Sequence, residues 1–221
     1  MNKIEVSIIQ KVIDWAGEFN IPDLKWIEHD SYKKGGYFKG IARDKDALAE
    51  LTTLNLLGYQ LPFLPKELFQ LTNLTRLHLS GNKLSEIPSE IGQLINLDEI
   101  YIAGNHLTSL PVEIGSLTKL KTLILPENRL TELPKELGNL EELEVLELGG
   151  NKLNSLPQEI GKLTNLSKLT LWKNKLKTLP KEMQDLTNLK ELDIMYNTIG
   201  LSSENIQWLE KLMAEDCSVN I

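Results

Sequence analysis

The chain has 221 residues, 41% of them hydrophobic and 25% charged, a composition typical of a soluble globular protein. Its formal net charge of −7 argues against nucleic-acid and membrane-surface partners, because neutralising phosphates requires clustered Lys and Arg. No stretch is apolar for long enough to cross a bilayer, and no secretory signal is visible at the N-terminus. The single cysteine, Cys217, cannot form an internal disulfide and favours a cytoplasmic location, although secretion as an effector without a visible signal peptide stays open.

Residues 1–50 contain no repeat and are expected to form an N-terminal helical cap. Apolar side chains at helical spacing predict an amphipathic helix over residues 4–19, which the dipeptide Ile21-Pro22 ends. Residues 34–37 are compatible with a hairpin turn, and residues 44–50 are typical of a short helix. An aromatic group in this segment leaves open a second interaction surface, made of Tyr32, Tyr37 and Phe38.

From residue 51 to residue 200 the sequence repeats every 23 residues. The segment LTRLHLSGNKL, which begins at Leu74, returns in recognisable form in five later copies. A degenerate first copy has Tyr59 where the other six copies have Asn. The second half of each unit follows L-P-x-E-[IL]-x-x-L, as in residues 87–94. The seven copies begin near Leu51, Leu74, Leu97, Leu120, Leu143, Leu166 and Leu189.

Each residue type in the repeat has a physical reason. Leu77 and Leu79 are two residues apart, so on a strand both side chains point into a core, and His78 between them points outward. Strands of successive repeats are expected to pair in parallel. Asn82 follows the strand where the chain turns, and its amide is expected to satisfy backbone groups of the turn and of the next coil, forming a ladder.

The Pro and Glu in the second half of each unit favour the start of a short helical or 3₁₀ segment. A structural role therefore explains the column of acidic residues better than binding does. That column consists of Glu67, Glu90, Glu113, Glu136, Glu159 and Glu182.

The pattern L-x-x-L-x-L-x-x-N-x-L resembles the leucine-rich-repeat signature, and over residues 51–199 the L-P-x-E form resembles bacterial and Ras-associated leucine-rich-repeat proteins. The resemblance implies an α/β fold, a right-handed leucine-rich-repeat solenoid or horseshoe with a parallel β-sheet on its concave face. Helical caps are expected at both ends, over residues 1–50 and 201–221, around seven repeats in residues 51–200. The C-terminal cap is predicted to contain a capped helix that runs from Ser202 to about Ala214.

Outward-pointing side chains on the strands are the candidates for binding. Arg76, Tyr101 and Ile124 are expected on three adjacent strands, and a second group gathers around Trp172. Single exposed aromatic residues are ordinary on protein surfaces, so the patch as a whole carries the hypothesis. The candidate partner-binding residues are Arg76, His78, Glu99, Tyr101, Ile124, Glu147, Trp172, Met195 and Tyr196.

A further column of residues precedes the last leucine of each motif and contains four fixed cations along one edge. These cations either steer an acidic partner or keep a solvated edge soluble. The column consists of Gln60, Lys83, His106, Arg129, Lys152, Lys175 and Thr198.

No catalytic, metal or cofactor site is predicted. His78 is expected within reach of Tyr101 and Glu99, but a metal site needs three or four converging ligands. The glycine pairs at 35–36 and 149–150 lack the residues that complete a phosphate loop. Cys217 is expected to be a small residue packed under the C-terminal cap rather than a nucleophile.

The resemblance therefore implies a non-catalytic module for protein–protein interaction that binds a partner protein on its concave face. It is expected to act as a monomer without a cofactor, as a bacterial scaffold or effector. The alternative is the substrate-recognition domain of a larger enzyme, such as a leucine-rich-repeat ubiquitin-ligase effector, or of a receptor, whose other domain lies outside this chain.

Overall fold

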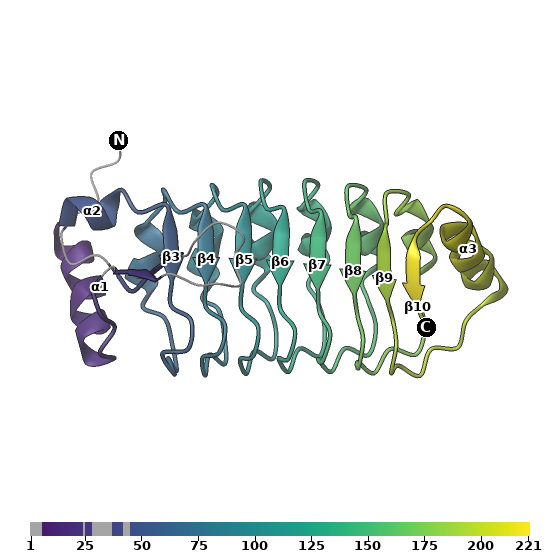
Figure 1. The fold of residues 1–221 in the computed structure, drawn as a ribbon, viewed down its shortest axis with the longest axis horizontal. Coiled ribbons are helices and arrows are strands. Elements are labelled where there is room, and N and C mark those ends of the chain that lie inside the picture. The colour runs from purple at the N-terminus through teal and green to yellow at the C-terminus, as the bar shows by residue number, and fades with distance from the viewer. Residues whose placement is uncertain (1–5, 24, 28–36, 42–44) are drawn as a thin grey trace.

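A computed structural model of the protein describes residues 6–23, 25–27, 37–41 and 45–221. One open sheet of eight parallel strands runs along its length, with one strand from each repeat and an eighth from the C-terminal segment (Figure 1). The order of strands in the sheet follows the chain, which confirms the expected parallel pairing of successive repeats. The strands are β3 (Thr53–Asn55), β4 (Arg76–His78), β5 (Glu99–Tyr101), β6 (Thr122–Ile124), β7 (Val145–Glu147), β8 (Lys168–Thr170), β9 (Glu191–Asp193) and β10 (Ser218–Asn220).

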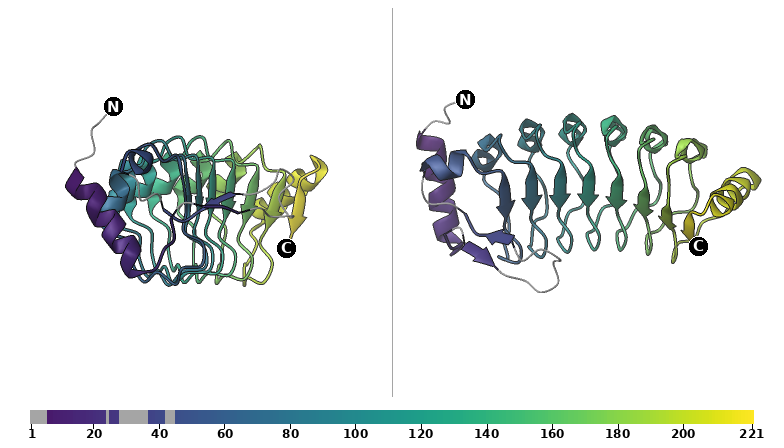
Figure 2. Two further views of the ribbon diagram at one scale, coloured as in Figure 1. Left: turned by 60° about the vertical axis from the view of Figure 1, so that its left-hand side comes forward. Right: turned by 45° about the horizontal axis from the view of Figure 1, so that its top comes forward.

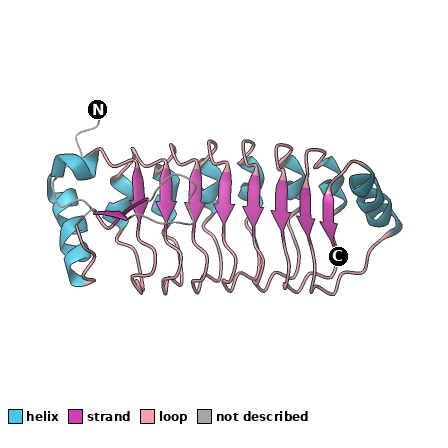
Figure 3. Ribbon diagram, viewed as in Figure 1, coloured by secondary structure: helices cyan, strands magenta, loops and turns pink. Residues whose placement is uncertain are grey.

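Short 3₁₀ segments line the side of the solenoid opposite the strands (Figures 2 and 3). A proline with extended backbone precedes each segment, and a glutamate lies in its first turn, as the Pro-x-Glu pattern predicts. The segments are η1 (Lys66–Gln70), η2 (Ser89–Gln93), η3 (Val112–Ser116), η4 (Lys135–Asn139), η5 (Gln158–Lys162) and η6 (Lys181–Asp185).

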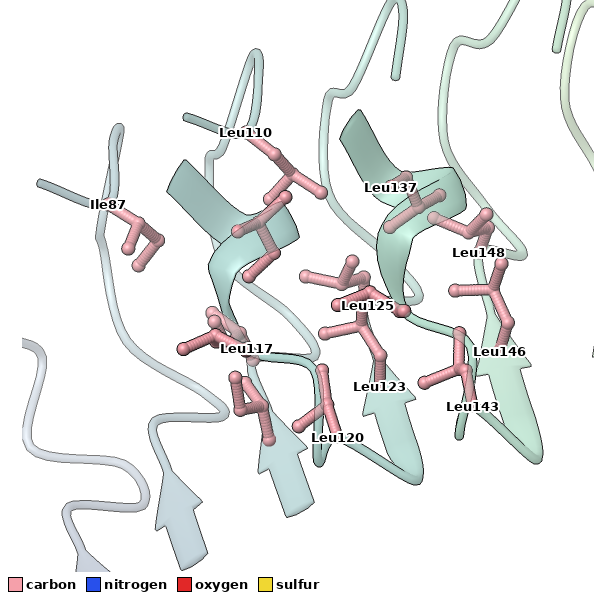
Figure 4. Packing of buried hydrophobic residues seen from close by; sticks show 14 of the residues in the cluster. Ile87, Leu110, Leu117, Leu120, Leu123, Leu125, Leu137, Leu143, Leu146 and Leu148 are labelled. Atoms are coloured by element: carbon pink, nitrogen blue, oxygen red, sulfur yellow. The ribbon is translucent and has the colours of Figure 1, made fainter. Parts of the chain in front are cut away.

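The leucines of strands and turns form one continuous core between these two layers (Figure 4). Leu123 and Leu125 flank Ile124 in β6 and are fully buried, whereas Ile124 itself is only half-buried. Burial of each such leucine contributes roughly 1.5–3 kcal/mol. The core of every interior coil is therefore completed by its two neighbours, so the coils depend on one another for stability.

An asparagine ladder connects the coils just after the strands. The amide nitrogen of Asn82 donates to the carbonyl oxygens of Leu56 and Leu79, both at 2.8 Å, and its Oδ1 accepts from the backbone N–H of Leu61 at 3.0 Å. Five later residues repeat this pattern, namely Asn105, Asn128, Asn151, Asn174 and Asn197.

The expectation of a ladder is confirmed, but the expected direction is wrong. Each asparagine reaches back to the preceding coil, as Asn82 reaches Leu56 and Leu61, and not forward to the next one. The equivalent groups of its own coil are bonded by the asparagine of the coil that follows, and the carbonyl oxygen of Leu79 accepts from both asparagines. Asn105, for example, accepts from Leu84 and donates to Leu79.

A second row of asparagines bridges the coils just before the strands, and the repeat pattern predicts no role for it. Its amide nitrogens donate to backbone carbonyl oxygens 24 residues earlier, in the preceding repeat or, for Asn73, in α2, at 2.7–3.0 Å. Because these bonds also satisfy backbone oxygens between coils, they extend the same principle to the opposite edge of the sheet. The four residues are Asn73, Asn96, Asn165 and Asn188.

Helix α1 (Val6–Glu18) lies at the N-terminal end of the solenoid, in agreement with the amphipathic pattern (Figure 1). Its Lys11 forms an ion pair of 2.9 Å with Glu67 of η1, so the acidic column receives one structural contact from the cap. That ion pair lowers the pKa of Glu67 below its usual value. Helix α2 (Lys45–Ala49) follows as predicted and leads into β3.

The strands β1 (Lys25–Ile27) and β2 (Tyr37–Lys39) pair antiparallel, and Tyr37, which the sequence placed in a hairpin turn, lies in β2. The backbone N–H of Gly40 bonds to the carbonyl oxygen of Asn55 at 3.1 Å and joins this segment to β3. Tyr32 and most of the predicted turn lie outside the described residues, as do the side chains of Tyr37 and Phe38.

Helix α3 (Ser203–Ala214) begins where the sequence predicts, and the Ser202 hydroxyl accepts the backbone N–H of Asn205 at 3.1 Å. After α3 the chain returns to add β10 beside β9, a strand that the sequence does not predict. Cys217, between α3 and β10, is buried as expected, and burial raises the pKa of its thiol. No helix in the described part of the chain is long and apolar enough to cross a membrane.

The ladder makes a direct prediction for stability. Asn128→Ala should lower the free energy of unfolding by about 1–3 kcal/mol, because it leaves buried backbone groups without partners. Urea denaturation followed by circular dichroism measures the change. Asn154→Ala is the matched control, since that side chain is exposed and should change stability little. Equal stability of the two variants would contradict the role of the ladder.

Candidate partner-binding surface

The first group of candidate residues lies together on neighbouring strands. Arg76 of β4 pairs in register with Glu99 of β5, and His78 pairs with Tyr101. Ile124 of β6 continues the second row, directly beside Tyr101. The sequence therefore places these five side chains on one face correctly. Strand alternation determines which face each side chain points to, and the 23-residue register determines which residues lie side by side.

Glu99 organises this group by contacting two of its members. The Arg76 guanidinium lies 3.0 Å from Glu99 Oε1, and the Tyr101 hydroxyl donates to Glu99 Oε2 at 3.0 Å. The rings of His78 and Tyr101 lie with their centroids 5.2 Å apart. An ion pair this exposed adds little stability, but the contacts restrict the side chains before any partner arrives.

A second charged network lies nearer the C-terminus and includes Glu147, another candidate. The Lys168 ammonium of β8 lies 3.0 Å from Glu147 of β7 and 3.3 Å from Glu191 of β9. Hydrogen bonding to Glu147, with a further contribution from Glu191, raises the pKa of Lys168 despite partial burial. Lys168 and Glu191 are not among the candidate partner-binding residues, because the charged network that contains them forms only when three strands lie side by side.

Trp172 follows β8 and is half-buried. The indole lies directly over Gly149 of the preceding repeat, where a Cβ atom would collide with the ring. The sequence pattern predicts no role for Gly149, because the residue that needs the space is 23 positions away. The absence of a side chain at Gly149 therefore leaves the space that the indole of Trp172 occupies.

Met195 and Tyr196, the remaining candidates, occupy the turn after β9. Met195 is half-buried, and its backbone N–H bonds to Asp193 Oδ1 at 3.0 Å. Tyr196 has a left-handed backbone with φ of 58° and is 74% exposed. It lies at the edge next to the concave face, one position beyond the column that contains Trp172.

The opposite edge of the sheet contains a shallow depression of about 530 Å³. Small-molecule sites are mostly apolar, whereas this depression is lined by polar and charged side chains. Among the described residues, no group of three or more His, Cys, Asp or Glu side chains could hold a metal ion. The residues lining the depression are Lys121, Glu142, Glu144, Asn165, Ser167, Asn188 and Lys190.

Comparison with known proteins identifies the repeat. The family described as leucine-rich repeats in two copies matches residues 72–115, and the family described as a leucine-rich repeat region matches residues 112–214. A solved structure of a leucine-rich-repeat protein from Leptospira interrogans is similar, with 40% sequence identity and a TM-score of 0.72. The match covers 78% of this chain and 43% of that protein, so this chain spans less than half of its length. No curated protein matches the sequence.

The packing of the Trp172 indole over Gly149 can be tested with a double-mutant cycle. Gly149→Ala should destabilise the protein by roughly 1–3 kcal/mol, because the new methyl group and the indole compete for the same space. In the Trp172→Ala background the same change should cost much less. Unfolding free energies of the four proteins measure the coupling, and an equal cost in both backgrounds would show that the ring does not rest on Gly149.

Proposed function

This chain is a leucine-rich-repeat protein, and on that premise we propose that it binds a partner protein on the concave face of its sheet. Leucine-rich-repeat domains generally mediate protein–protein interaction, and solenoids present an extended concave surface suited to it. Because the repeat leaves the outward positions free, those positions determine which partner is bound.

The observation that carries the proposal is the row of large side chains on β4, β5 and β6. His78, Tyr101 and Ile124 lie side by side in register, and none of the three is needed for the core. Aromatic residues and arginine are enriched among the side chains that dominate binding energy, and Arg76 lies in the neighbouring row, two residues before His78 on β4. The contacts through Glu99 hold the group in place, which reduces the entropy lost on binding.

In this proposal the protein acts without catalysis and without a cofactor, as a monomeric scaffold or effector of bacterial origin in the cytoplasm. Its single cysteine supports a reducing location. The alternative is that the repeats form the substrate-recognition part of a larger enzyme or receptor. The same concave surface would then bind the substrate, so both versions depend on the same residues.

Combined replacement of two aromatic residues tests the proposal. Tyr101→Ala with Trp172→Ala should weaken binding of a partner captured from lysate by roughly 2–4 kcal/mol, because both rings leave the surface. Calorimetric titration of the captured protein measures the loss, and thermal unfolding checks that the fold is retained.

The matched control is Ile95→Ala with Val112→Ala, which removes two apolar side chains that are 54% and 53% exposed outside the strands. This control should bind as the parent does. If the partner binds the aromatic variant as tightly as it binds the control, the concave face is not the binding surface.

A further inference from the structure

Four lysines gather on the edge that follows the strands in the fifth and sixth repeats. They are Lys152, Lys173, Lys175 and Lys177, which we name the lysine edge, and all four are exposed. Lys152 and Lys175 occupy equivalent positions in neighbouring coils, since each donates its backbone N–H to the carbonyl oxygen of a leucine in the coil before it, at 2.9 Å. The stacking of the coils therefore places Lys152 and Lys175 in one column, and Lys173 and Lys177 lie two residues before and two residues after Lys175 in the chain.

These cations differ from those on the concave face. Arg76 and Lys168 are neutralised by glutamates within 3.3 Å. Over the part of the chain that the structure describes, no member of the lysine edge forms an ion pair. In a chain with a net charge of −7, which has ample carboxylates for pairing, this edge keeps its positive charge available to a partner.

At Lys173 the backbone of the lysine edge carries strain that repeats with glycine at the same position avoid. Directly before the ladder asparagine, three repeats have glycine with φ between 62° and 69°. Lys173 and Tyr196 adopt the same left-handed conformation, with φ of 53° and 58°. This conformation costs a residue with a Cβ atom roughly 1–2 kcal/mol. Glu127 is the third such residue, and its carboxylate lies against Gly150.

The strained positions place specific side chains on this surface. Lys173 adds a charge to the lysine edge, and Tyr196 presents its ring to solvent in the next repeat. Trp172, the residue before Lys173, is held over Gly149. Strain kept at exposed positions suggests that the side chains gained there have a use in binding.

Resting on the protein-binding function proposed above, we infer that the lysine edge, with Trp172 and Tyr196, binds an acidic segment of the partner protein. Carboxylates of such a segment would pair with the lysines, and its apolar side chains would contact the two rings. The site lies beside the concave face and extends the binding surface around its edge.

The charges nearby favour a protein over a nucleic acid. The adjacent strands carry Glu147, Glu191 and Asp193 against the single cation Lys168. A phosphate backbone passing from the edge across the sheet would meet these carboxylates, whereas a protein can present acidic residues to the edge alone.

Binding of a labelled peptide tests the inference without the natural partner. Fluorescein-labelled decaglutamate should bind the parent protein at low salt, and the variant with Lys152→Gln, Lys173→Gln, Lys175→Gln and Lys177→Gln should bind roughly tenfold more weakly or worse. Fluorescence anisotropy measures the dissociation constant, which should also rise with added salt.

The control variant carries Lys121→Gln, Lys135→Gln, Lys162→Gln and Lys181→Gln, which changes the net charge equally at exposed lysines elsewhere. It should keep most of the affinity for decaglutamate. No binding to the parent protein, or an equal loss in both variants, would overturn the inference. If a fifteen-nucleotide oligothymidylate bound through the same lysines as tightly as decaglutamate does, the choice of an acidic protein would be overturned.

A second variant separates binding from stability. Tyr196→Gly should leave the melting temperature unchanged or raise it, because glycine accepts the left-handed backbone, while binding of a decaglutamate peptide with a central Phe weakens severalfold. A variant that lost stability and kept full binding would contradict the interpretation of the strain.

The two proposals can fail separately. Peptide binding that does not depend on the lysine edge would leave the role of Tyr101 in partner capture untouched. Conversely, a partner whose affinity is unchanged by Tyr101→Ala alone would contradict the proposed function even if decaglutamate bound as expected.

Discussion

The hydrogen bonds of buried backbone groups between coils are the constraint on which the rest of the structure depends. A coil of 23 residues with three-residue strands leaves many N–H and C=O groups unpaired within itself. The asparagine after each of the strands β4 to β9 satisfies two carbonyl oxygens and one N–H, as Asn82 does, and two of these three groups belong to the preceding coil. Stacking is therefore specified by polar contacts as well as by the leucine core. Each coil is fixed in register with its neighbour, so outward side chains fall into straight columns.

That regularity explains how the surface can carry specific chemistry. Columns place Tyr101 beside Ile124 and Glu99 beside Arg76 without any requirement from the core. Departures from the repeat are then the informative positions. Lys173 and Tyr196 stand where the turn favours glycine. Gly149 has no side chain, and the indole of Trp172 occupies the space where one would lie. Such exchanges trade local stability for side chains at the surface.

The sequence predicts the repeats well because their periods are encoded locally, in Leu77 and Leu79 on a strand or in a Pro-x-Glu start. It also predicts which strands carry Arg76, Tyr101 and Ile124. It does not predict β10. This strand has only three residues, two of them exposed, which is too short a segment to show a recognisable strand pattern. The sequence also does not predict the packing of Trp172 over Gly149 or the ion pairs of Lys168, since both depend on side-chain positions in neighbouring coils.

The function proposed for this protein requires that a partner protein contacts the concave face. A photo-crosslinking residue, p-benzoylphenylalanine, placed at Ile124 in the middle of the sheet tests it most directly, with the same residue at Ile95, which lies outside the strands, as the comparison. If the partner lies on the sheet, position 124 should give a covalent adduct with a protein and position 95 should give none. An adduct from position 95 alone, or equal adducts from both positions, would contradict the proposed function.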